Sequence, residues 1–279
     1  MSDQFINFWQ HIPEKITPYI FKIGDFEFRY YGLMYIAAFM TVYLLSLYRL
    51  KKEPFNYSKD MIENLFVWII LGLMMGARLG YVLFYNLDYY SSHLSEIVLP
   101  FTFEGGFHFT GLAGMSYHGG MIGVILSSAL FCRKYKINFW ELGDFLAPSI
   151  PLGYTFGRIG NFINGELYGR VTDTSWGMYF PNDMTGLLRH PSQLYEAFFE
   201  GIFLFIILWG IRGIRPFSGI FISLYLIGYG TVRFFIEFVR EPDPQIGLLS
   251  GYVTMGQTLC LSMILAGGIL FIVRRRSLI

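Results

Sequence analysis

The feature that most constrains this chain is a series of long apolar stretches in which charged residues are nearly absent. A helix needs about 20 mostly apolar residues to cross the roughly 30 Å hydrocarbon layer of a bilayer. Seven stretches meet this requirement, at approximately 30–49, 61–85, 113–132, 142–158, 194–211, 217–239 and 253–273. The sequence therefore predicts an all-α polytopic membrane protein with about seven transmembrane helices.

The composition agrees with lipid as the main solvent. Only 15% of the 279 residues are charged and the mean hydropathy is +0.45, whereas about a quarter of the residues in an ordinary soluble domain are charged. The net charge of +1 gives no strongly basic surface. The two cysteines, Cys132 and Cys260, stand far apart in apolar surroundings and indicate neither a disulfide framework nor a metal site. A soluble, disordered or nucleic-acid-binding protein is disfavoured.

The distribution of Lys and Arg predicts the orientation of the chain. One set of loops holds 12 of the 21 basic residues, namely Arg49, Lys51, Lys52, Lys59, Arg133, Lys134, Lys136, Arg212, Arg215, Arg274, Arg275 and Arg276. The connection from Asn86 to Tyr117 holds no basic residue. Because basic loops stay in the cytoplasm, we expect a periplasmic N-terminus and a cytoplasmic C-terminus.

No repeat or linker divides the sequence, so we expect one integral membrane domain over residues 1–279. Its two long outward excursions are predicted at about 86–115 and 162–193, and loops of that length in compact proteins are usually functional. Charges interrupt every apolar run in residues 1–29, which we interpret as an extramembrane or interfacial segment and not as a signal peptide. The chemistry is expected on the outer side.

Several polar residues lie where the membrane should not tolerate them. A charged side chain at membrane depth costs about 3 kcal/mol, so each is a candidate functional residue. At 1.5 Å per residue, Arg78, Arg158 and Arg233 lie roughly 24 to 26 Å above the inner ends of their predicted helices. His118 and Tyr31 lie near the outer ends of theirs. The spacing predicts one outer layer of titratable groups from five helices.

The stretch GYGTVRFFIEFVREPD carries the clearest polar stripe. Tyr229, Arg233, Glu237 and Arg240 are spaced so that one helical face presents all four. One interpretation is an Arg233–Glu237 ion pair that neutralises itself and only joins helices. The other is that a guanidinium remains for an anion, since arginine binds phosphate in a bidentate manner.

The stretch GRIGNFINGELYGR, residues 157–170, places a charge, two amides and a carboxylate within nine residues through Arg158, Asn161, Asn164 and Glu166. Its glycines, Gly169 among them, permit close backbone approach. Earlier in the same predicted span, Pro148 and Pro151 are expected to interrupt the helix. Packing of small residues would account for the glycines but leaves the polar set unexplained.

Two further motifs contain histidine. In SYHGGMIG, the two glycines after His118 are expected to clear space around an imidazole that titrates near neutral pH, as a general base requires. The alternative is a hydrogen-bonded structural histidine. In RHPSQLYE, Ser192 is the expected N-cap of the next helix, and His190 and Arg189 are either interfacial anchors or headgroup contacts.

Taken together these motifs resemble the prolipoprotein diacylglyceryl transferase family of bacterial inner membranes. The resemblance covers nearly the whole chain, through YYGLMY at 30–35, GARLGYVLFYN at 76–86, SYHGGMIGVI at 116–125, GRIGNFINGELYGR at 157–170, RHPSQLYE at 189–196 and GYGTVRFFIEFVREPD at 228–243. GRIGNFINGE is the most specific of them. The outer loop at 87–115 looks longer than in many relatives, and the stretch at 177–188 looks shorter.

The resemblance implies a seven-helix enzyme that moves the diacylglyceryl group of phosphatidylglycerol onto the thiol of a preprolipoprotein lipobox cysteine. Its partners would be phosphatidylglycerol, preprolipoprotein signal peptides and membrane lipids, with no cofactor, no metal and no nucleic acid. It implies Arg158 and Arg233 as headgroup contacts and His118 as a catalytic residue. It also implies a set of sensitive positions for phosphatidylglycerol binding, namely Tyr31, Asn161, Glu166, Gly169, Tyr229, Glu237 and Arg240.

Two other functions fit parts of the sequence. An anion or lipid transporter would also place arginines in a membrane cavity, but transporters commonly show repeated halves, and none is visible. An intramembrane serine protease could use Ser116 beside His118, although the sequence holds no Gly-x-Ser-x-Gly turn.

Overall fold

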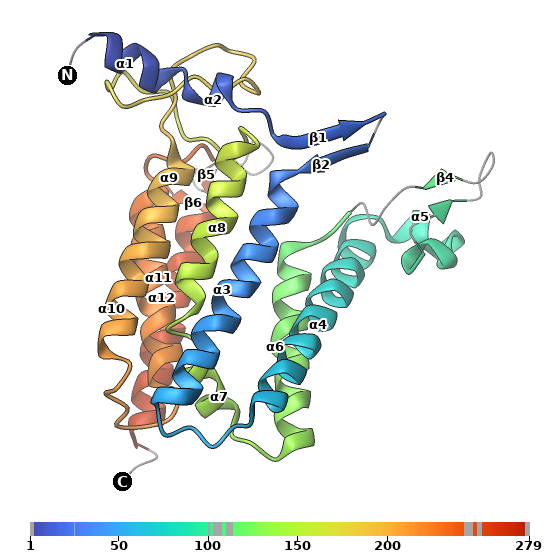
Figure 1. The fold of residues 1–279 in the computed structure, drawn as a ribbon, viewed down its shortest axis with the longest axis vertical. Coiled ribbons are helices and arrows are strands. Elements are labelled where there is room, and N and C mark those ends of the chain that lie inside the picture. The colour runs from blue at the N-terminus through green and yellow to red at the C-terminus, as the bar shows by residue number, and fades with distance from the viewer. Residues whose placement is uncertain are drawn as a thin grey trace. The chain divides into compact units, whose positions relative to one another are not determined.

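The computed structural model describes residues 3–24, 26–99, 101–102, 108–109, 114–242, 248–249 and 253–276. Most of these residues are helical (Figure 1). The chain forms two compact units, unit 1 from residues 1–53 and 143–279 and unit 2 from residues 54–142. Each unit is described by itself.

Unit 1 contains an N-terminal segment, a group of long helices and two short β-hairpins. Its elements are α1 (Asp3–Gln10), α2 (Ile12–Lys15), β1 (Tyr19–Ile23), β2 (Phe26–Arg29), α3 (Tyr30–Lys52), α8 (Ile150–Ile163), α9 (Ser192–Glu196), η2 (Ala197–Phe203), α10 (Leu204–Ile211), α11 (Ile220–Ile236), β5 (Leu248–Leu249), β6 (Val253–Thr254) and α12 (Met255–Arg276). Helix α7 (Phe139–Leu146) crosses the boundary between the units. Helix α8 lies against α3 and η2, and α11 packs along α12.

Unit 2 is built on two helices that pack against each other along their length. Its elements are α4 (Lys59–Tyr85), α5 (Leu87–Ser92), η1 (Leu94–Ile97), β3 (Phe101–Thr102), β4 (His108–Phe109) and α6 (Tyr117–Tyr135). Glycines allow the close approach of the two helices, since a Cβ atom at Gly76 or Gly123 would collide with backbone of the opposite helix. Such contacts replace the hydrophobic effect between helices in lipid.

Among the residues that the structure describes, four helical segments are long and apolar enough to cross a membrane, namely 30–52, 59–85, 192–211 and 255–276, and α11 is a shorter apolar helix. Their surfaces remain apolar. Helix α12, for example, exposes Leu259, Leu261, Leu265, Ile269, Ile272 and Val273. Soluble proteins rarely expose contiguous apolar surface of this kind. The chain is therefore a multi-pass membrane protein.

The span predicted at 142–158 is not one continuous helix, and its predicted interruption at Pro148 and Pro151 is confirmed. The structure breaks it into α7 and α8 between Ala147 and Ser149, because Pro148 and Pro151 have no N–H to continue the ladder. Helix α8 then continues to Ile163, so Arg158 lies inside the helix and not at its end.

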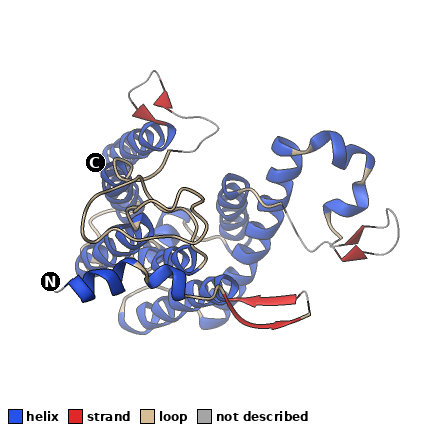
Figure 2. Cartoon of the chain, turned by 90° about the horizontal axis from the view of Figure 1, so that it is seen from above, coloured by secondary structure: helices blue, strands red, loops and turns tan. Residues whose placement is uncertain are grey.

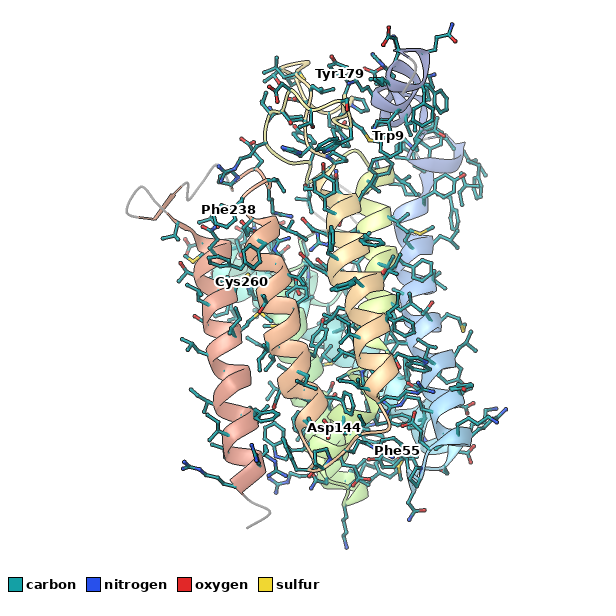
Figure 3. The ribbon with its side chains drawn as sticks, turned by 90° about the vertical axis from the view of Figure 1, so that its left-hand side faces the viewer. Trp9, Phe55, Asp144, Tyr179, Phe238 and Cys260 are labelled. Atoms are coloured by element: carbon teal, nitrogen blue, oxygen red, sulfur yellow. The ribbon has the colours of Figure 1, made fainter. Side chains whose placement is uncertain are left out.

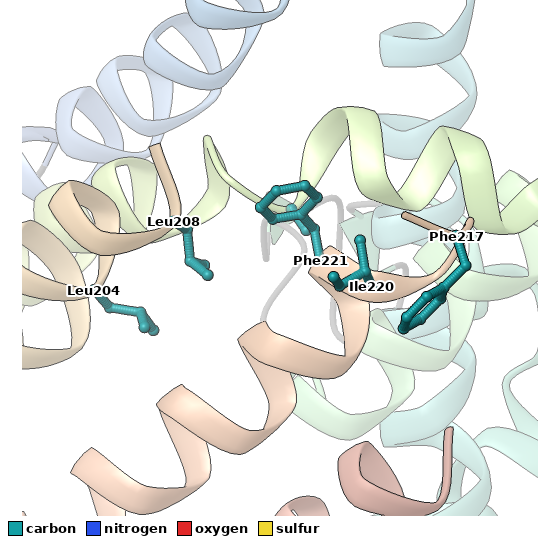
Figure 4. Packing of buried hydrophobic residues seen from close by; sticks show 6 residues of the cluster. Leu204, Leu208, Phe217, Ile220 and Phe221 are labelled. Atoms are coloured by element: carbon teal, nitrogen blue, oxygen red, sulfur yellow. The ribbon is translucent and has the colours of Figure 1, made fainter. Parts of the chain in front are cut away.

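The loop before α11 is held by Asp144 of α7. Its carboxylate accepts hydrogen bonds from the N–H groups of Gly219 at 2.6 Å and Phe221 at 2.8 Å, which caps the start of α11. Beside this cap a cluster of buried apolar side chains joins α10 to α11 (Figure 4), including Leu204, Leu208 and Phe221. At the same end the buried Arg49 pairs with Glu53, which also binds Arg212.

At the opposite end of unit 1, α1 and α2 lie over the long loop at 164–191 (Figures 2 and 3). Trp9 Nε1 donates to the carbonyl of Trp176 at 2.9 Å, and the N–H of Tyr179 donates to the carbonyl of Gln10 at 2.8 Å. Figure 3 shows Trp9 and Tyr179 at this end and Asp144 at the other. The loop is thus anchored between the N-terminal segment and the ends of α8 and α9.

Candidate active site

A single buried carboxylate in unit 1 binds three arginines. Glu196, at the end of α9, is fully buried. Its Oε2 lies 2.8 Å from Nε of Arg158, and its Oε1 lies 2.9 Å from Nη1 of both Arg233 and Arg240. The structure therefore brings α8, α9 and the C-terminal end of α11 together around one charge.

A second buried carboxylate lies one turn further along the same helix. Glu200 is also fully buried, and it accepts a hydrogen bond from Tyr154 Oη at 2.5 Å. Arg158 Nε lies 2.5 Å from the same Tyr154 oxygen, and Arg233 Nη1 lies 3.6 Å from Glu200. Glu200 falls in η2, which has π-helical geometry, and π-turns inside helices frequently mark functional sites.

Glu237, the C-cap residue of α11, supplies the third carboxylate. It forms an ion pair with Arg233 and lies 3.8 Å from Nε of Arg240. The ion pair predicted from the spacing of Arg233 and Glu237 is therefore present, but it forms part of a larger network in which Arg233 also contacts both buried glutamates.

Accessibility separates the positive from the negative groups of this network. The side chains of Arg158, Arg233 and Arg240 are 17%, 12% and 14% exposed, whereas those of Glu196, Glu200 and Glu237 are 0%, 0% and 5% exposed. Three cations and three anions balance formally, and the cationic side chains keep more of their surface accessible than the carboxylates do. A guanidinium has five N–H donors in a fixed fork, which suits an anion such as phosphate.

A chain of polar side chains extends the network along α8. Arg158 Nη1 donates to Asn161 Oδ1 at 3.3 Å, and Asn161 Nδ2 donates to Glu166 Oε1 at 2.7 Å. Tyr31, at the start of α3, interacts with Asn161 and lies 3.2 Å from the hydroxyl of Tyr35. The structure thus connects Tyr31, Asn161 and Glu166 to the arginines.

The expected N-cap at Ser192 is wrong. Pro191 occupies the N-cap position, and Ser192 is the first residue of α9. The Ser192 hydroxyl donates instead to the carbonyl of Leu167 at 2.9 Å. The Ser192 hydroxyl does not cap α9, because its oxygen faces the preceding loop. Its hydrogen bond fastens that loop to the helix.

Gly169 joins the same loop to the end of α11. Its N–H donates to the carbonyl of His190 at 2.8 Å, and it pairs with Arg240 in an isolated β-bridge. A Cβ atom at this position would collide with the carbonyl of Val239 and the side chain of His190. The backbone that carries Arg240 can approach only because residue 169 is glycine.

An apolar pocket of about 460 Å³ lies beside the network in unit 1. It is lined by side chains of the loop at 164–191, of α9 and η2, and of α11 and the residues that follow it, namely Trp176, His190, Tyr195, Phe199, Val232, Phe235, Ile236 and Val239. Burial lowers the pKa of His190, an effect partly offset by Asp173. Within α11, Tyr229 packs edge-on against Tyr154 of α8. The charged network is therefore flanked by apolar surface.

His118 and Arg78 belong to unit 2. His118 is exposed near the start of α6, which Ser116 caps. Gly119 and Gly120 are buried against α4, so the expectation that they clear space around the His118 ring is wrong: helix packing requires them. Arg78 donates to the carbonyls of Glu96 and Ile97 and so orders the loop at 86–115 of its own unit. Part of that loop, residues 100, 103–107 and 110–113, lies outside the described residues.

Sequence reasoning missed Glu196, Glu200 and Tyr154 as members of the site. A usable signal was present, because Glu196 and Glu200 are two acids spaced i, i+4 in an apolar span, where each charge needs a partner. In this sequence the rule that charges at membrane depth mark functional residues had predicted the arginines but not these two acids.

The loop at 164–191 contains an ion pair that predicts how the loop responds to acid. Burial would raise the pKa of Asp183, but hydrogen bonds from Arg189 and Thr185 hold that pKa below its usual range. A carboxylate of this kind stabilises the folded state above its unfolded pKa, about 3.9, and the stabilisation is lost as the pH falls through the lower folded value. We expect the protection of the amides in residues 164–191 against hydrogen exchange, measured relative to their intrinsic exchange rate at each pH, to fall below about pH 4.

The Asp183→Asn variant should show that loss of protection already at neutral pH. Glu241→Gln is the matched control, since Glu241 binds the same arginine but is half exposed, and it should behave like the unchanged protein. Identical exchange in Asp183→Asn and in the unchanged protein at every pH would contradict this account of the loop.

Comparison with known proteins identifies the family. The model of the family described as prolipoprotein diacylglyceryl transferase matches residues 18–273. The chain is 52% identical over 275 residues to a phosphatidylglycerol–prolipoprotein diacylglyceryl transferase of Chlorobaculum tepidum, covering 98% of this chain and 95% of the relative. A protein of the same description from Bordetella avium is 48% identical over 263 residues, or 94% of this chain and 96% of the relative. Together with the arginine network, these matches show that the chain belongs to the prolipoprotein diacylglyceryl transferase family.

Proposed function

We propose that this chain is a transferase that moves the diacylglyceryl group of phosphatidylglycerol to the thiol of the lipobox cysteine of preprolipoproteins. A thioether forms and glycerol 1-phosphate is released, as the first step of bacterial lipoprotein maturation. The observation that carries the proposal is the arrangement of three guanidiniums around Glu196, in which the arginine side chains are partly accessible and the carboxylates are buried.

The arginines stabilise the headgroup in the proposed reaction. Sulfur attacks the glyceryl carbon, the C–O bond breaks, and the phosphate monoester leaves with an additional negative charge. A cation at that place stabilises the transition state more than the ground state. Arg158 and Arg233 take this catalytic role. The headgroup-binding set also includes Tyr31, Asn161, Glu166, Gly169, Tyr229, Glu237 and Arg240.

His118 is the proposed base for the incoming thiol. A thiol of pKa about 8.5 is mostly protonated at neutral pH, so the attack needs a proton acceptor. The exposed position of His118 on α6 is compatible with this role. Both cysteines of the chain itself are buried, and the nucleophile comes with the substrate.

Replacing His118 by asparagine should lower kcat by roughly 100-fold, in the range typical of general base catalysis, with little change in KM for phosphatidylglycerol. The pH dependence of kcat near neutrality should disappear with the imidazole. The measurement is the initial rate of peptide lipidation between pH 6 and 9. An unchanged pH profile in His118→Asn would remove the residue as a base.

The proposed topology has seven transmembrane segments in the bacterial inner membrane, with a periplasmic N-terminus and a cytoplasmic C-terminus. The short helix α8, whose 14 residues extend only about 21 Å, would cross together with α7. The distribution of basic residues supports this orientation. The arginine network would then lie toward the periplasmic side, and residues 1–279 would act as one functional domain.

The test is the mass of a lipobox peptide after incubation with the purified protein and phosphatidylglycerol. The peptide should gain one diacylglyceryl group, and phosphatidylglycerol with a labelled headgroup should release water-soluble glycerol phosphate in equal amount. A transporter would move the label without either product. Absence of both products with folded protein would reject the proposed function.

A further inference from the structure

The side chain of Thr254 contacts the charged network from outside, and neither the sequence motifs nor the comparisons assign it a role. We propose that Thr254 is a positioning residue: its hydroxyl orients the Glu237 carboxylate, which in turn holds Arg233 in place for the phosphate headgroup. This inference rests on the proposed function and adds a residue of α12's N-terminus to it.

The hydrogen bonds of Thr254 fix the direction of its hydroxyl. The Thr254 Oγ1 accepts a hydrogen bond from the N–H of Gln257 at 3.0 Å, while Gln257 Oε1 accepts one from the N–H of Thr254 at 3.0 Å. This reciprocal pair is a capping box at the start of α12. A hydroxyl can donate its hydrogen while its oxygen accepts a bond. The Thr254 hydroxyl donates to Oε2 of Glu237, which lies 3.0 Å away.

Glu237 therefore divides its two oxygens between two partners. Oε2 accepts from Thr254, and Oε1 pairs with Arg233. Both Thr254 and Glu237 are only 4% exposed, so water cannot easily replace a lost partner. A carboxylate held at both oxygens has one orientation, and that orientation directs Oε1 toward the guanidinium.

The start of α12 is shaped to receive this carboxylate. A Cβ atom at Gly256 would collide with the Glu237 carboxyl group, so only glycine leaves room for it. The N-terminal end of a helix also favours negative charge. The capping box alone would explain the bonds within α12, but it does not explain a carboxylate from α11 seated against Gly256.

The experiment is a double-mutant cycle on kcat/KM for phosphatidylglycerol, measured with equal amounts of folded protein. Thr254→Val should lower kcat/KM roughly tenfold, as expected for the loss of one buried hydrogen bond to a charged group, and Thr254→Ser should stay within about twofold of the unchanged protein. In the Glu237→Gln background, Thr254→Val should have less than about a twofold further effect, because coupled residues are not additive.

Two additional variants separate positioning from helix capping. Thr258→Val removes a hydroxyl of the same helix that donates to the carbonyl of Thr254, and it should keep full activity. Gly256→Ala leaves Thr254 intact but displaces the Glu237 carboxylate, and it should lower kcat/KM like Thr254→Val. Gly256→Ala keeps the inference testable even where Thr254→Val does not fold.

The inference is overturned if Thr254→Val retains full activity. It is also overturned if Thr254→Val still lowers kcat/KM tenfold in the Glu237→Gln background, because Thr254 would then act through the cap of α12. Full activity in Gly256→Ala would also overturn it. If the unchanged protein itself lipidates no peptide, the proposed function fails, and this result is distinct from a failed cycle in an active enzyme.

Discussion

Replacing Arg233 by alanine is expected to lower kcat/KM for phosphatidylglycerol by at least about 100-fold, the loss typical of removing one group that stabilises a developing anion. Arg233 contacts all three carboxylates of the network, and 12% of its side chain is exposed. Arg158→Ala should have an effect of the same size. The measurement is the rate at which a lipobox peptide gains the mass of a diacylglyceryl group.

Two controls accompany this prediction. Arg233→Lys should not restore the rate, because an ammonium group cannot form the fork of parallel hydrogen bonds. Arg212→Ala removes another ion-paired arginine of unit 1, bound to Glu53 near the Asp144 cap, and should keep its activity. Unchanged rates in Arg233→Ala or Arg158→Ala would refute the assignment of the headgroup site.

The second large effect is expected on stability. Glu196→Ala leaves Arg158, Arg233 and Arg240 without the buried carboxylate that binds all three. Removing one partner of a buried ion pair costs about 3 to 5 kcal/mol, which is a large part of the stability of a typical domain. We expect a markedly lower Tm of the detergent-extracted protein, or loss of folded protein during expression.

Glu241→Ala is the matched control for that experiment. Glu241 also binds an arginine, Arg189, but its side chain is 47% exposed. Pairs exposed to water contribute about 0 to 1 kcal/mol, so its Tm should hardly change. Equal Tm values for Glu196→Ala and the unchanged protein would show that Glu196 does not hold the network together.

The sequence predicts the helical class and the outer charged stripe because both depend on local spacing. Arg233 and Glu237 share a helical face wherever the helix lies, and Pro148 interrupts a helix in any context. By contrast, the partner of Arg158 is Glu196, 38 positions further along the chain, and no periodicity links α8 to α9. The prediction that Ser192 is an N-cap is wrong for the same reason. Its hydroxyl donates to the carbonyl of Leu167 in the preceding loop instead of capping α9.

The histidine motif shows a second limit of local reasoning. Glycines beside a functional residue predict open space only when nothing else packs against them. Gly119 and Gly120 are instead in contact with α4, a contact that depends on how two spans associate. The geometry of the charged network also depends on which helices meet, and this is why local spacing predicts Arg233 and Glu237 but not Glu196 and Glu200.

The π-helical turn at Ala197–Phe203 makes the length of this segment as important as its composition. Residues before the turn contribute Glu196 to the network, while residues after it form α10, whose Ile206 and Ile207 are exposed. Deleting one residue from the turn would rotate these two parts relative to each other by about 100°. Either Glu196 would move away from the arginines, or the apolar face of α10 would no longer face lipid. A one-residue deletion that preserves every charged residue should therefore still inactivate the protein.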